Sequence, residues 1–136
     1  MNTPTLYYTK VGSSYQVVRD FKIQTEILGL TACSDLYCLT ADGMLYIYKW
    51  YAWDGPTGGW NTDSFVKASC VHDVLCEMIN EGILPRSTQP LADGEMHKIN
   101  HDAGMWLPRV IWTYGAVRFY QAHKKYITGK RQVLEA

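Results

Sequence analysis

The chain has 136 residues, and its 13 basic and 13 acidic residues give a formal net charge of zero. This length predicts one domain with a hydrophobic core of its own. The charge balance argues against a global field that would attract nucleic acid or an anionic membrane, so we expect no direct binding of nucleic acid.

No stretch approaches the ~20 apolar residues that a membrane helix needs. The first residues, MNTPTLYYTK, lack the basic and apolar regions of a signal peptide. We therefore expect a protein made in a cytoplasm, without signal peptide or transmembrane segment. The cysteines lack CxxC spacing and are expected to be reduced, mostly buried thiols: Cys33, Cys38, Cys70 and Cys76.

The N-terminal third has the two-residue alternation typical of β-strands, broken at Val18 and Arg19. The predicted strands cover residues 6–10, at an edge, 15–24, 36–40 and 44–53. The last two flank Ala41-Asp42-Gly43, a short turn that predicts a β-hairpin.

Three helices are predicted after the strands. The first covers about residues 62–80, with its N-cap among residues 61–63 and Gly82 as its C-cap. Ser87 or Thr88 caps a second helix that ends near Gly104. A third begins at about Pro108 and ends near residue 128. We therefore predict one α+β domain over residues 1–136, mainly β over 1–54 and helical over 61–129. An N-terminal antiparallel sheet or hairpin is followed by three packed helices.

The adjacent pair His72-Asp73 lies on the first predicted helix. At about 100° per residue, His72 falls within the apolar stripe of that helix and Asp73 on its rim. A buried imidazole needs a polar partner. Asp93, on the rim of the apolar stripe of the second helix, becomes that partner if the two helices pack antiparallel. The pair could then be a general base with its orienting acid, or a structural link between helices. His97 and His101 follow on the second helix and are expected to be exposed.

The loop before the first helix is rich in glycine. Asp54 and the backbone of Gly55, Gly58 and Gly59 could hold calcium together with Asp73. The alternative is an ordinary turn that leads into the helix cap.

Aromatic residues are abundant, with ten tyrosines and five tryptophans. Such residues suit half-buried sheet faces and also protein interfaces. The candidate interface residues are Trp50, Trp53, Trp60, Trp106 and Trp112.

The blocks YAWDGPTGG, KASCVHDVLCEM, LADGEM and TYGAVRFY, in this order, resemble a family of short phage and prophage proteins of unknown function. Cys76 stands where that family usually has tyrosine. The His-Asp helix facing an aspartate-bearing helix is also remotely similar to the secreted calcium-dependent phospholipases. That similarity implies His72 as the base, Asp93 as its orienter, and calcium held by Asp73 and the glycine loop.

Two functions follow as hypotheses. The first is a phage-encoded accessory protein made in the host cytoplasm and incorporated into the virion at the head, tail or tail tip, with other phage proteins as partners. The second is a calcium-assisted hydrolase of lipid or cell-envelope bonds, with contact to a membrane or envelope. Oligomeric state is left open.

Overall fold

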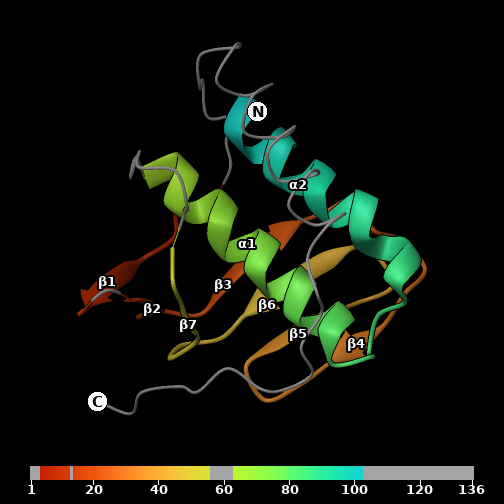
Figure 1. Ribbon diagram of the computed structural model, residues 1–136, viewed down its shortest axis with the longest axis horizontal. Helices are drawn as coiled ribbons and strands as arrows, with labels where there is room; N and C mark the ends of the chain where they lie inside the picture. The colour runs from red at the N-terminus through yellow and green to blue at the C-terminus, as the bar shows by residue number, and fades with distance from the viewer. Residues whose placement is uncertain (1–3, 13, 56–62, 103–136) are drawn as a thin grey trace. The chain divides into compact units, whose positions relative to one another are not determined.

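The computed structural model describes residues 4–12, 14–55 and 63–102. They belong to two compact units, which we call the β unit (Pro4–Gly55) and the helical unit (residues 63–102). The predicted α+β class is confirmed (Figure 1). The described residues form two antiparallel sheets and two α-helices, whereas one sheet and three helices were predicted. The predicted third helix lies outside the described residues, and the single domain stays a prediction.

The two sheets of the β unit have strand orders β1–β2–β7 and β3–β6–β5–β4. Their strands are β1 (Tyr8–Val11), β2 (Ser14–Val17), β3 (Phe21–Gln24), β4 (Ala32–Cys33), β5 (Tyr37–Leu39), β6 (Met44–Ile47) and β7 (Ala52–Trp53). The predicted strands 15–24 and 44–53 were therefore too long. Each is broken once, and its two halves belong to different sheets.

The two breaks lie opposite each other. Gln16 faces Ala52 on one side of them, and Phe21 faces Ile47 on the other. The number of residues between Gln16 and Phe21 equals the number between Ile47 and Ala52. The pairing register is therefore the same on both sides of the two breaks, which together form a bend between the sheets. Within the bend, the Asp20 carboxylate accepts a 2.8 Å hydrogen bond from the backbone N–H of Lys49. A side chain thus replaces a lost bond of the ladder.

The predicted hairpin is confirmed as the pair β5–β6, in which Leu39 faces Leu45. Its turn needs glycine at position 43, where φ is +84°. A Cβ atom on Gly43 would lie 2.6 Å from the Thr25 carbonyl oxygen. Both the backbone conformation and the lack of space therefore explain this glycine.

The expectation of four reduced cysteines was wrong for two of them. Cys33 and Cys38 face each other in the β4–β5 pairing and form a disulfide. Their sequence spacing gave no such signal, because only the strand register brings them opposite each other. Cys70 and Cys76 are buried thiols on the first helix.

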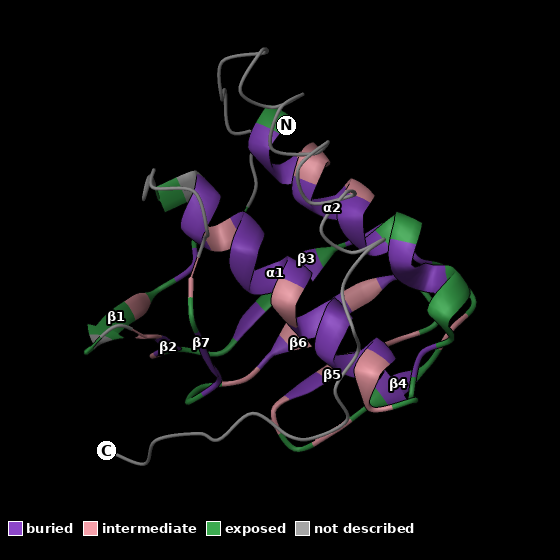
Figure 2. Ribbon diagram, viewed as in Figure 1, coloured by how far each residue is buried: buried purple, intermediate pink, exposed green. Residues whose placement is uncertain are grey.

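Figure 2 shows buried residues along the strands of the β unit. The buried side chains are mainly apolar, and many of them are aromatic. Trp53 is fully buried, and its ring stacks on Tyr15 and Tyr51 with centroids 5.6 and 6.2 Å away. The alternation along β3 is regular, with Phe21 and Ile23 buried and the residues after each exposed. This is the pattern expected of a strand with one buried face.

The helical unit contains α1 (Asp63–Asn80), the short 3-10 helix η1 (Arg86–Thr88) and α2 (Gln89–Asp102). The predicted end of the first helix is confirmed: Gly82 follows it, and the Ile83 N–H returns to the Met78 carbonyl at 3.0 Å. Neither α1 nor α2 combines the length and apolarity that a membrane-spanning helix needs.

Candidate functional site

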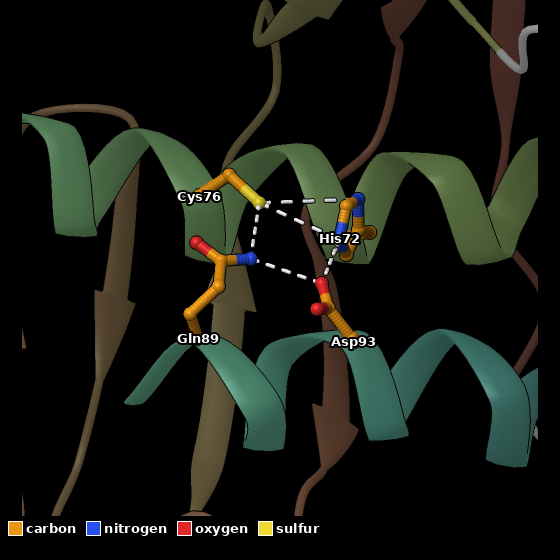
Figure 3. Close-up of polar contacts among 4 residues, drawn as sticks. All are labelled: His72, Cys76, Gln89 and Asp93. Atoms are coloured by element: carbon orange, nitrogen blue, oxygen red, sulfur yellow. Dashed lines mark hydrogen bonds and ion pairs between the residues drawn. The ribbon is translucent and has the colours of Figure 1, made fainter. Parts of the chain in front are cut away.

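The two helices pack against each other as an antiparallel pair (Figure 1). His72 on α1 contacts Asp93 on α2, and Cys76, one turn later on α1, contacts Gln89, one turn earlier on α2 (Figure 3). His72 is buried within the predicted apolar stripe of α1, as expected. The buried members of that stripe are Phe65, Ala68, Val71, Leu75, Cys76 and Ile79. The antiparallel packing thus brings four polar side chains together inside the helical unit. We call His72, Cys76, Gln89 and Asp93 the polar cluster.

The predicted partnership of His72 and Asp93 is present. His72 Nε2 lies 2.6 Å from Asp93 Oδ1, and the side chains are 8% and 0% exposed. The sequence predicted that Asp93 lies at the edge of the apolar stripe of the second helix, whereas its side chain is fully buried. A buried carboxylate is stable only when it is paired and hydrogen-bonded, and Asp93 meets this requirement through its contact with His72.

Two further members of the cluster were not singled out from the sequence. The Cys76 Sγ atom lies 3.5 Å from Nε2 and 3.9 Å from Nδ1 of His72. The Gln89 amide donates to Asp93 Oδ1 at 2.9 Å and to Cys76 Sγ at 3.4 Å. Cys76 lies four residues after His72, and Gln89 lies four residues before Asp93. This spacing places each pair on one face of its helix, and it is the sequence signal that could have identified Cys76 and Gln89.

The environment of His72 favours its protonated form. Burial lowers the pKa of the imidazole, but three neighbours outweigh this effect: Cys76, by charge and hydrogen bond, Asp93, by hydrogen bond, and Asp73, by charge. Together they raise the pKa from 6.5 to about 10. The imidazole is therefore protonated at neutral pH and donates its Nε2–H to the Asp93 carboxylate. A protonated imidazole cannot accept a proton as a general base does.

The cluster contains a group of side chains that could hold a metal ion. One ligand atom each from His72, Cys76 and Asp93 lies within 4.8 Å of the other two. A thiolate, an imidazole and a carboxylate form a ligand set that suits zinc. Calcium prefers oxygen ligands alone, so these three residues do not indicate calcium.

The residues of the predicted calcium site are placed as follows. Asp73 is half-buried on α1, in the helical unit, and Asp54 is exposed beyond β7, in the β unit. Neither belongs to the group of side chains that could hold a metal ion. The backbone and the packing both favour glycine at position 55, because its φ is +85° and an added Cβ would overlap the Tyr15 ring. Gly58 and Gly59 lie outside the described residues.

The candidate interface tryptophans differ in their surroundings. Trp53 is fully buried in the β unit, so its side chain is part of the core. Trp50 is 38% exposed and lies at the bend between the sheets. Trp60, Trp106 and Trp112 lie outside the described residues. On the second helix, His101 is exposed and His97 is half-buried.

No family model, curated protein or solved structure matches the chain. The resemblances to the phage family and to the phospholipases stay predictions.

Proposed function

We propose that this chain is a phage accessory protein that joins the virion, at the head, tail or tail tip, by binding another virion protein through its three-stranded sheet β1–β2–β7. One observation carries the proposal. Two exposed aromatic side chains, Tyr7 and Trp50, flank the end of β2 from its two sides.

The backbone places these aromatic residues beside the same segment. The Val18 N–H bonds to the Tyr7 carbonyl at 3.0 Å, and the Trp50 N–H bonds to the Val17 carbonyl at 2.8 Å. Tyr7 is 47% exposed and Trp50 38% exposed. Because tyrosine and tryptophan supply much of the binding energy at protein interfaces, this end of the sheet is the preferred binding surface.

Each aromatic ring also has a cation over it. The Arg19 guanidinium lies 4.4 Å from the centroid of Tyr7, and the Lys49 ammonium lies 4.5 Å from the centroid of Trp50. The surface therefore combines apolar rings with positive charge. We expect the partner to present acidic side chains around an apolar contact, because charge complementarity governs specificity and association rate.

The test is incorporation into particles. The tagged chain is expressed during phage induction, particles are purified on a density gradient, and the chain is quantified by mass spectrometry. The amount of the chain in the particles should fall at least tenfold in the double variant Tyr7→Ala/Trp50→Ala. Leu28→Ala removes another exposed apolar side chain of the β unit and is the matched control. This variant should be incorporated into the particles as the wild type is. Wild-type chain that stays out of the particles, or full incorporation of the double variant, contradicts the proposal.

A second candidate is the calcium-assisted hydrolase of lipid or cell-envelope bonds. The 2.6 Å contact between His72 and Asp93 favours it, because a base needs an orienting acid. The raised pKa and the burial of His72 make it the weaker candidate. Fatty-acid release from phospholipid vesicles with calcium tests it, with His72→Gln as the inactive control. Wild-type activity no greater than that of His72→Gln rejects it.

A further inference from the structure

We propose that His72, Cys76 and Asp93 bind a single divalent ion of the zinc class, which connects α1 to α2 inside the helical unit. The proposal rests on the convergence of three different ligand types in the polar cluster (Figure 3). It is independent of the proposed interface on the β unit.

The direction of the contacts distinguishes a metal site from a thiol nucleophile with its base. In a nucleophile–histidine–acid triad, the nucleophile and the acid contact opposite nitrogens of the ring. Here Asp93 Oδ1, at 2.6 Å, and Cys76 Sγ, at 3.5 Å, both lie closest to the same nitrogen, Nε2 of His72. Convergence on one point suits a shared ion better than a proton relay.

The three ligand atoms lie within 4.8 Å of one another, and one of their separations equals that of a tetrahedral zinc site. With Zn–N and Zn–O bonds of about 2.0–2.2 Å and Zn–S of about 2.3 Å, neighbouring ligand atoms lie roughly 3.3–3.7 Å apart. The separation of Cys76 Sγ from His72 Nε2, 3.5 Å, already falls in this range. The 2.6 Å contact of His72 with Asp93 must open by roughly 0.7 Å, as the ion replaces the proton between them.

Gln89 supplies the outer support that metal sites usually have. Its amide donates to both Asp93 Oδ1, at 2.9 Å, and Cys76 Sγ, at 3.4 Å. Hydrogen bonds of this kind orient the ligands and stabilise their negative charge. All four members of the cluster are buried, so the ion would lie inside the helical unit and connect its two helices.

The experiment titrates Zn²⁺, Co²⁺ and Ca²⁺ into the full chain after treatment with a chelator. We expect one Zn²⁺ per chain, and with Co²⁺ a thiolate-to-cobalt charge-transfer band together with the d–d bands of tetrahedral coordination. Exposed histidines such as His101 cannot produce the thiolate band. Absence of that band in the wild type overturns the proposal, and so does binding of calcium without zinc.

Two variants of α1 distinguish metal binding by Cys76 from binding by the other buried thiol of that helix. Cys76→Ser should abolish the thiolate band and weaken Zn²⁺ binding at least tenfold. Cys70→Ser removes the other buried thiol of α1 and should change neither. Equal bands in both variants contradict the assignment.

A measurement on the wild type covers the case in which Cys76→Ser fails to fold, as judged by circular dichroism. Zn²⁺ should then protect Cys76 from alkylation by iodoacetamide more than it protects Cys70, as read by mass spectrometry. Equal rates with and without Zn²⁺ overturn the proposal.

Discussion

The β unit and the helical unit bury different kinds of side chain. In the described part of the β unit, the buried polar side chains are Gln16 and Thr25, whereas all the others belong to the helical unit. The latter are Ser69, His72, Glu77, Thr88, Gln89, Asp93, Glu95 and Asn100. Buried polar groups destabilise a fold unless they are paired. The contrast teaches that the sheets are specified by apolar packing and strand register, and the helix pair by polar contacts as well.

The strongest test of this contrast is the removal of one member of the buried pair. Asp93→Ala leaves the His72 cation buried without its carboxylate, and we expect a loss of about 3–5 kcal/mol in the free energy of unfolding. Chemical denaturation followed by far-UV circular dichroism measures it. The control, Asp35→Ala, removes an exposed carboxylate of the β unit and should change stability by less than about 0.5 kcal/mol.

Replacement of both partners sharpens the result. The double variant His72→Met/Asp93→Leu removes the charges together and fills the space with apolar groups, so it should recover most of the loss seen in Asp93→Ala. A double variant as unstable as the single one would mean that the polar contact itself stabilises the helix pair.

The next largest effect is a pH dependence that arises from His72 in the helical unit. In metal-free protein the pKa of His72 is about 10 in the folded state, against 6.5 without its neighbours. Protonation therefore stabilises the fold below pH about 6.5, and this stabilisation is lost as the pH rises through about 10. Among the described residues, the charged and titratable groups that act on the imidazole are Asp73, Cys76 and Asp93.

Denaturation with a chelator present, repeated across this pH range, should show decreasing stability in the wild type. His72→Gln should reduce the slope. His101→Gln, at an exposed position of α2, should leave it unchanged. Stability that rises with pH in the wild type contradicts the prediction.

The smallest expected effect concerns the β unit, where Trp50 has a φ of +85°. Because a side chain disfavours this backbone conformation, Trp50→Gly should be more stable than Trp50→Ala by about 1 kcal/mol. Both variants lack the indole, so thermal denaturation of the two isolates the backbone effect. Equal stabilities would show that position 50 adopts an ordinary conformation in solution.

Sequence periodicity predicted the elements whose signals are local. The hairpin around Gly43, the extent of α1 and its end at Gly82 follow from alternation, helical spacing and glycine. The pairing of His72 with Asp93 could also be predicted, because a buried imidazole on one helix requires a partner on its neighbour.

The remaining features depend on contacts between residues distant in the sequence. Alternation weakens at Val18, but only strand pairing assigns β2 and β7 to one sheet and β3 and β6 to the other. The Cys33–Cys38 disulfide depends on the register of β4 with β5.

The sequence by itself determined that His72 is buried on the apolar face of a helix and needs a polar partner, because helical geometry fixes which residues share a face. Only the tertiary structure decided that Cys76 and Gln89 join His72 and Asp93 in one cluster, in which His72, Cys76 and Asp93 could hold a metal ion. The reason is that a metal site depends on distances between side chains from two helices, and those distances are set by how the helices pack.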